Sequence, residues 1–169
     1  MRMTRWTSAL DLGFPPDVLQ AIGAIVVSYS ALDLTVNTFL WHMAESKEQH
    51  LGEVFLANIN FAAKLDIFGA AYRKHVRPGE DTSDVDAALT LAAKATDARN
   101  ALLHSLLIGN RSKDTILAVR IRARRKGHSR LRKRISVSEL EQTDLLIRDA
   151  IAAINNVGEP MMLRLLGKP

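Results

Sequence analysis

Apolar residues recur at three- and four-residue spacing along much of the chain, which is the spacing of one buried helix face. Between Pro15 and about Ser46 the recurring positions are Ile22, Ile25, Val26, Tyr29, Leu32, Val36 and Leu40. A similar rhythm continues from Leu51 to about Val76, with a bend expected at the tripeptide "NIN". The pattern therefore predicts two long amphipathic helices in the first half of the chain.

A third helix is expected after the break "RPGEDTSD", in which Pro78 and Gly79 stop the second helix. Ser83 or Asp84 can serve as its N-cap, because a short polar side chain accepts hydrogen bonds from the first free backbone amides. The apolar pattern then continues to about Ile108, where Gly109 and Asn110 provide the stop signal.

Beyond Asn110 the period changes from that of a helix to that of a strand. In "ILAVRIRARR" apolar residues and arginines alternate, which indicates a strand with two unlike faces. "KGHS" is a turn sequence, and "RLRKRISV" can form the return strand. We therefore predict a short basic β-hairpin over residues 114–137.

The last part of the chain predicts a fourth helix. Ser138 and Glu141 fit a capping box, and Gly158 with Pro160 is expected to close the helix before a short tail helix that reaches residue 166. We expect an all-α, up-and-down four-helix bundle with the basic β-hairpin inserted between the third and fourth long helices. It would be a single domain over 1–169, with the first three helices in 15–110 and the C-terminal helices in 138–166.

Composition places the chain among soluble globular proteins. It has 47% hydrophobic and 24% charged residues, and no cysteine, which excludes disulfides and thiolate chemistry. The apolar segment 21–41 has the length of a membrane span, but Asp33 and Asn37 interrupt it. We expect a buried helix, no membrane association and a cytoplasmic location.

Charge is distributed unevenly. Residues 111–134 contain eleven basic residues and one acid, Asp114, whereas the rest of the chain has twelve basic and seventeen acidic residues. An arginine-rich segment of this density favours contacts with the phosphates of a nucleic acid, although a solvated strand face is the plainer interpretation. No aromatic residue lies among the candidate RNA-binding residues, which are Arg120, Arg122, Arg124, Arg125, Lys126, Arg130, Arg132, Lys133 and Arg134.

The sequence "RNALLH" places Arg99, Asn100 and His104 in the otherwise apolar third helix. Asn100 and His104 share a helix face, and Asp97 lies one turn before Asn100 on that side. A partly buried arginine needs a partner. Asp33 and Asn37 are candidates for that supporting role, in which case Arg99 would form an internal ion pair and His104 would be an ordinary core histidine.

"RNALLH" also resembles the R-N-x-x-x-H signature of the HEPN superfamily, which consists of small all-helical domains. The architecture of residues 15–157 is similar, and "INFAAKLDIF" resembles the second helix of several bacterial members. No tyrosine follows closely after the histidine, so the variant paired with nucleotidyltransferase antitoxins is not matched.

The resemblance implies a homodimer in which two motifs face each other, and a metal-independent ribonuclease without a cofactor. Arg99 would bind the scissile phosphate, Asn100 would orient the histidine or the phosphate, and His104 would transfer protons, since imidazole exchanges them near neutral pH. Such an enzyme fits a toxin or antiphage effector, with an antitoxin or regulatory protein as a further partner.

Two other interpretations stay open from the sequence. Many HEPN domains bind RNA or protein without cutting, and a plain structural bundle could carry the motif by coincidence. No metal site is expected, because the histidines are scattered and no carboxylate cluster is present. Lys64 could reach a phosphate, but we expect it to be a surface lysine.

Overall fold

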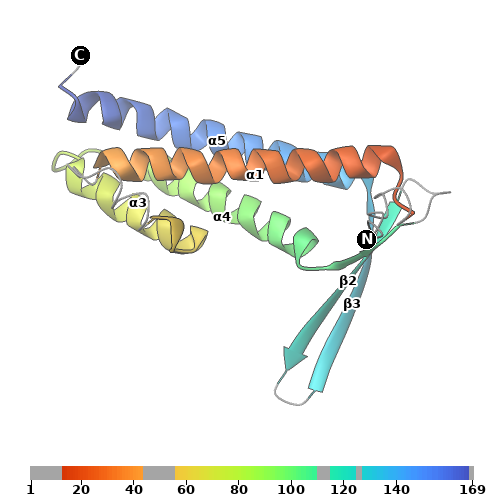
Figure 1. The fold of residues 1–169 in the computed structure, drawn as a ribbon. Coiled ribbons are helices and arrows are strands. Elements are labelled where there is room, and N and C mark those ends of the chain that lie inside the picture. Colours follow the sequence, from red (N-terminus) through yellow and green to blue (C-terminus); the bar gives the residue numbers. More distant parts are fainter. Residues whose placement is uncertain (1–12, 44–55, 110–114, 125–126, 168–169) are drawn as a thin grey trace, which may run out of the picture. The chain divides into compact units, whose positions relative to one another are not determined.

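The computed structural model describes residues 13–43, 56–109, 115–124 and 127–167, and for strand residues 120–124 and 127–130 it describes the backbone only. The elements in chain order are α1 (Pro16–Met43), α3 (Phe61–His75), α4 (Ser83–Leu103), β1 (Leu106–Ile108), β2 (Thr115–Arg124), β3 (Gly127–Ser136) and α5 (Val137–Leu165). The chain is mainly helical, as predicted, with a small antiparallel sheet of order β1-β2-β3 (Figure 1).

The chain divides into two compact units. The first, the sheet unit, comprises residues 1–27 and 97–145, and the second, the helical unit, comprises 28–96 and 146–169. Helices α1, α4 and α5 therefore contribute residues to both units. The expectation of a single domain over 1–169 stays a prediction.

Aromatic and branched aliphatic side chains form the core of the helical unit. Phe68 of α3 is fully buried and meets the Phe39 ring of α1 edge-on, with the centroids 6.3 Å apart. Buried aliphatic residues come from α1 and α5: Leu32, Val36, Ile147 and Ile154. Leu32, Val36 and Leu40, whose spacing predicted the first helix, are thus buried, whereas Val26 of the same series is 44% exposed.

The break predicted within the second helical segment is present. Residues 56–57 are helical, and a turn then leads to Asn60, whose Oδ1 accepts a 2.9 Å hydrogen bond from the Ala63 amide. Asn60 thereby caps α3. At α4 the predicted cap is displaced by one residue, because the Thr82 carbonyl already accepts from the Asp86 amide and Ser83 lies inside the helix.

Helix α5 does not end at Gly158 and Pro160, so that prediction is wrong. Pro160 lacks the N–H that would donate to the carbonyl four residues earlier, but it is exposed, where water can satisfy that carbonyl. Contacts on both sides of Pro160 stabilise the continued helix. Val157 and Met161 are buried, and Arg164 forms a bidentate ion pair with Glu80 at 3.0 and 2.9 Å.

The third helix ends earlier than predicted. Helix α4 stops at Leu103, and Leu106–Ile108 forms β1, which pairs antiparallel with β2. The Ser105 side chain and amide satisfy the carbonyls of Ala101 and Leu102 at 2.7 and 3.1 Å. The chain can therefore leave the helix without losing hydrogen bonds, and its next three residues pair with the sheet.

The predicted β-hairpin is confirmed, with ten residues in each strand (Figure 1). Its register pairs Ile116 with Ile135 near the helical end and Arg124 with Gly127 at the tip. Buried Ile116, Ala118 and Val119 of β2, with Leu140 of α5, form part of the core of the sheet unit. The hairpin is therefore built on the core at its base.

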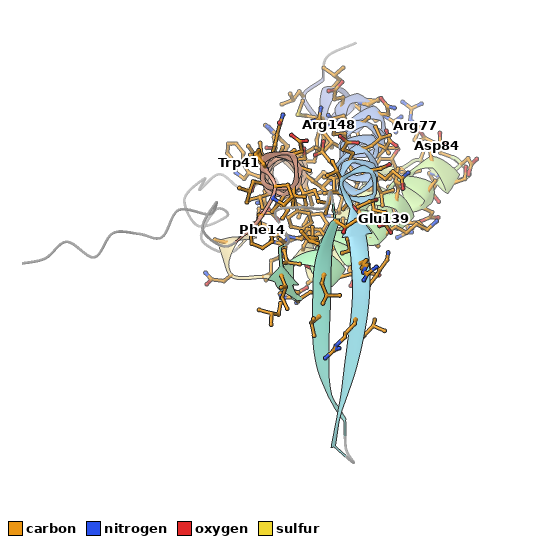
Figure 2. All side chains as sticks on the ribbon, turned by 90° about the vertical axis from the view of Figure 1, so that its right-hand side faces the viewer. Phe14, Trp41, Arg77, Asp84, Glu139 and Arg148 are labelled. Atoms are coloured by element: carbon orange, nitrogen blue, oxygen red, sulfur yellow. The ribbon has the colours of Figure 1, made fainter. Side chains whose placement is uncertain are left out.

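The capping box at the start of α5 lies two residues earlier than predicted. Ser136 Oγ accepts from the Glu139 amide at 3.2 Å, and Glu139 Oε2 accepts from the Ser136 amide at 2.9 Å. Ser136 is the last residue of β3, so the strand passes directly into the helix, with Glu139 at the junction (Figure 2). The prediction of a box at Ser138 and Glu141 was wrong, because Ser136 and Glu139 satisfy the same Ser-x-x-Glu pattern two residues earlier.

Helix α1 is long and apolar enough to cross a membrane, judged by length and composition alone. Only 22% of its most apolar stretch is buried, so the expected buried helix is buried along one face, which includes Val18, Ile25, Leu32 and Val36. The same helix also exposes Val27 and Leu34, whose exposed fractions are 70% and 66%. The cytoplasmic location stays a prediction.

Candidate functional site

The last turn of α4 brings Arg99 and Asn100 into direct contact. Arg99 Nη1 donates a 2.9 Å hydrogen bond to the Asn100 side-chain oxygen, and both side chains are partly buried. Neighbours in a helix do not share a face, so the flexible arginine side chain must bend around the helix to make this bond. Asn100 therefore holds one end of the guanidinium. The planar guanidinium carries five N–H groups, and those on its other nitrogens point away from Asn100.

His104 lies just beyond the end of α4, in the turn that leads to β1. Its amide still donates to the Asn100 carbonyl at 3.1 Å, so its backbone position is fixed by the last turn of the helix. The residue is exposed, which contradicts the interpretation of His104 as a core histidine. An exposed imidazole on a fixed backbone is available for proton transfer with a bound molecule.

Asp97 is exposed on α4, three residues before Asn100. The sheet unit thus carries a carboxylate, an amide and a guanidinium on the last two turns of α4, and an imidazole on the residue that follows the helix. A guanidinium recognises phosphate oxygens through paired hydrogen bonds, and an imidazole can accept or donate a proton. Together these groups offer the elements of phosphodiester cleavage.

A pocket of about 230 Å³ lies on a different face of the end of α4. It lies between α4, the base of the hairpin and the start of α5, and its lining includes Ala101, Leu102, Leu131, Lys133 and Glu139. Arg99, Asn100 and His104 are not among its lining residues. The pocket is therefore separate from the motif.

The predicted supporting residues Asp33 and Asn37 lie on α1 in the helical unit and bind each other. Asn37 Nδ2 donates to Asp33 Oδ2 at 3.2 Å, and Lys64 of α3 donates to Asp33 Oδ1 at 2.7 Å. Only 5% of the Lys64 side chain is exposed, so the expectation of a surface lysine was wrong. The role of Asp33 and Asn37 in holding Arg99 stays a prediction.

The predicted RNA-binding residues are distributed along both strands of the hairpin. Arg125 and Lys126 lie outside the described residues. For Arg120, Arg122, Arg124 and Arg130 the structure gives the backbone register. In it Arg120 pairs across the strands with Leu131, and Arg130 pairs with Ile121. Arg132, Lys133 and Arg134 are exposed on β3.

Lys133 differs from its two arginine neighbours. Its Nζ forms a 2.9 Å ion pair with Glu139 Oε1, at the point where β3 meets α5. This hydrogen bond, together with the one from the Ser136 amide, holds the pKa of the Glu139 carboxyl below its usual value. Lys133 therefore has an internal partner, which reduces its availability to bind a phosphate.

Sequence reasoning missed the third strand. Leu106–Ile108 is a short apolar run directly after a strong helical pattern, and such a run fits a helix end as well as a strand. The available signal was Gly109 with Asn110 on one side and Ser105 on the other, which are typical flanks of a short strand.

Among the described residues, no group of three histidine or carboxylate residues is placed to hold a metal ion. No known protein family, curated protein or solved structure matches the chain.

Proposed function

We propose that the chain is a HEPN-like, metal-independent endoribonuclease with an up-and-down four-helix arrangement. The observation that carries this proposal is the Arg99–Asn100 hydrogen bond beside an exposed His104, in the same compact unit as the basic hairpin. The unit thus combines a phosphate-binding group, a proton-transfer group and a strongly cationic arm.

The reaction is an attack of the RNA 2′-hydroxyl on the adjacent phosphodiester. The 2′-oxygen loses its proton to a base and forms a bond to phosphorus, while the bond from phosphorus to the 5′-oxygen breaks and that oxygen takes a proton. The products are a 2′,3′-cyclic phosphate and a 5′-hydroxyl end. DNA can bind but lacks the nucleophile.

Each motif residue has a role in this scheme. His104 is the proton-transfer group, and Arg99 binds the phosphate and stabilises the charge that develops on its oxygens. Asn100 is a positioning residue, since its side chain holds the guanidinium of Arg99. Asp97, exposed on the preceding turn, is the supporting residue of the motif.

The proposed enzyme is a homodimer, in which a second motif supplies a second imidazole. Arg99 and His104 are five residues apart on one chain, so they do not share a helix face. Two chains can supply both groups to one phosphate. Exposed apolar residues on α1, such as Val27 and Leu34, are of the kind that an interface covers. A toxin or antiphage effector with an antitoxin partner fits such an enzyme.

The alternative function is a non-catalytic RNA-binding module of the same fold. The observation in its favour is that exposed arginines on β3 offer phosphate contacts that do not require the motif. In that case Arg99 and Asn100 have a structural role at the end of α4.

Incubation of the purified protein with labelled single-stranded RNA in excess EDTA tests the proposal. The wild-type protein is compared with His104→Ala and Arg99→Ala, and Lys94→Ala, an exposed lysine on the same helix, serves as the control. We expect cyclic-phosphate ends with the wild-type and control proteins and intact RNA with both motif variants. Intact RNA with the wild-type protein, bound in a salt-sensitive manner, would support the binding module instead.

A further inference from the structure

The register of the sheet aligns six side-chain positions in two rows across one face. The first row is Leu106 of β1, Val119 of β2 and Arg132 of β3. The second row is Ile108, Leu117 and Arg134. Directly opposed residues in an antiparallel sheet share a face, so each row runs from an edge aliphatic residue to an edge arginine.

The edge residues of both rows are open to solvent, whereas between them Val119 is buried and Leu117 is half-buried. Leu106 and Ile108 are 63% and 47% exposed, and Arg132 and Arg134 are also exposed. Within the described part of the chain, neither arginine forms an ion pair with an acidic residue. The face therefore presents two adjacent aliphatic side chains along one edge and two cations along the other.

The opposite face of the same strands has a different character. Leu107, Ala118 and Lys133 form the intervening row, and Lys133 is paired with Glu139. Ala118 and Lys133 also line the pocket beside α4. The cations and aliphatic residues that can meet a ligand together are thus concentrated on the face with Arg132 and Arg134.

We propose that this face, the row face, binds an unpaired and extended RNA strand, with its phosphates along β3 and its bases on Leu106 and Ile108. The inference rests on the proposed function in taking RNA as the ligand. It adds the class of RNA and the residues that select it.

The dimensions of the sheet fit this ligand. The two arginines are two residues apart on one strand, which separates them by about 7 Å and allows each to meet one of two successive phosphates. Strands lie about 4.8 Å apart, so β1 is about 10 Å from β3, within reach of a base whose phosphate lies on β3. Each row can accept one nucleotide.

An unpaired strand fits better than a duplex because of the aliphatic edge. In a duplex the base faces are stacked inside the helix, and a flat protein surface meets phosphates, sugars and groove edges. Leu106 and Ile108 would then remain next to charged or hydrated groups. Unstacked bases can instead bury these side chains without any preference for sequence, since every base has an apolar face.

His104 is two residues before Leu106, and the row face therefore begins directly after the proposed proton-transfer residue. Bases that lie on Leu106 and Ile108 are therefore at the edge of the sheet that follows His104 in the chain, whereas the phosphates on β3 are at the opposite edge. This placement links the binding surface to the proposed site within one compact unit.

Binding should be measured by fluorescence anisotropy with a short RNA whose 2′-oxygens are methylated, so that cleavage cannot occur, as a single strand and as a duplex. The double variant Arg132→Gln/Arg134→Gln is compared with Lys74→Gln/Lys94→Gln, which changes two exposed lysines of the helical unit. Leu106→Ser/Ile108→Ser is compared with Leu131→Ser, whose residue is 62% exposed but lies on the other face.

We expect the single strand to bind more tightly than the duplex. The arginine variant should weaken binding about tenfold or more and reduce the salt slope by about 1.4, the contribution of two phosphate contacts on a single strand. The Leu106/Ile108 variant should weaken binding with an unchanged salt slope, and both controls should bind like the wild-type protein.

Equal affinity for the duplex, or wild-type affinity in the Leu106/Ile108 variant, would overturn the inference. So would a change from dimer to monomer in that variant with intact RNA binding, which would assign the row face to a second copy of the chain. Cleavage of unmodified RNA by the same proteins separates the two proposals. Row-face-dependent binding without cleavage contradicts the ribonuclease function alone, whereas cleavage without row-face-dependent binding contradicts the inference alone.

Discussion

Asn100 accepts a hydrogen bond from Arg99 at 2.9 Å, although the two residues are neighbours in a helix. Replacing Asn100 with alanine removes the acceptor and lets the guanidinium move from this position. For the proposed enzyme we expect kcat to fall by about 10- to 100-fold with little change in KM, because the loss concerns orientation. Single-turnover and steady-state assays measure both constants. A raised KM with an intact kcat would instead assign Asn100 to substrate binding.

The Asp33–Lys64 pair predicts a large difference between two aspartates. Asp33→Asn removes the carboxylate from an ammonium whose side chain is 5% exposed, and we expect a loss of about 2–3 kcal/mol in the free energy of unfolding. Asp66→Asn changes an exposed residue on the same helix as Lys64 and should cost less than about 0.5 kcal/mol. Urea unfolding followed by circular dichroism compares them. Equal midpoints would show that the buried pair contributes nothing.

Two helical glycines predict opposite effects of the same substitution. A Cβ at Gly158 would lie 2.6 Å from the Phe39 ring, which is itself buried, whereas a Cβ at Gly23 meets nothing within 4 Å. Gly158→Ala should therefore destabilise by about 1–2 kcal/mol despite the better helix propensity of alanine. Gly23→Ala should stabilise by about 0.5–1 kcal/mol. Thermal unfolding gives the sign of each effect, and a stabilised Gly158 variant would contradict the close packing of α5 on Phe39.

The Glu80–Arg164 pair predicts a pH dependence of stability. Its hydrogen bonds lower the pKa of Glu80 from 4.5 to about 2. Because the folded-state pKa is lowered, the stabilisation is fully present above the unfolded-state pKa and is lost as the pH falls from about 4.5 toward 2. The stability difference between the wild-type protein and Glu80→Gln should be constant near neutral pH and disappear across that range. Urea titrations at several pH values measure it, with Glu141→Gln, an exposed residue, as the control.

The sequence predicted the elements better than their ends. Periodicity located the helices and the hairpin, because buried positions such as Leu32 and Val36 repeat at the helical spacing. The end of α4 and the continuation of α5 past Pro160 depended on contacts with distant residues. Leu106–Ile108 leaves the helix to pair with β2, and Arg164 continues a helix whose local sequence signals a stop.

The candidate site was located by the motif, but its arrangement required the structure. The spacing of Arg99 and His104 placed both at one helix end, whereas the exposure of His104 follows from the turn that leads to β1. The sequence also did not show that Lys133 has an acidic partner while its arginine neighbours on β3 do not share it. Alternation alone puts Lys133 and Arg134 on opposite faces, but the acid that pairs with Lys133 is on another element.

Glu139 has a consequence for the mechanics of the sheet unit. One carboxylate receives hydrogen bonds from the last residue of β3 and from Lys133 within it, while its own backbone lies in the first turn of α5. A displacement of the end of β3 must therefore either break these bonds or pull on that turn. Glu139 thus fixes the base of the hairpin to α5, so a force applied to the strand is transmitted first to the start of the helix.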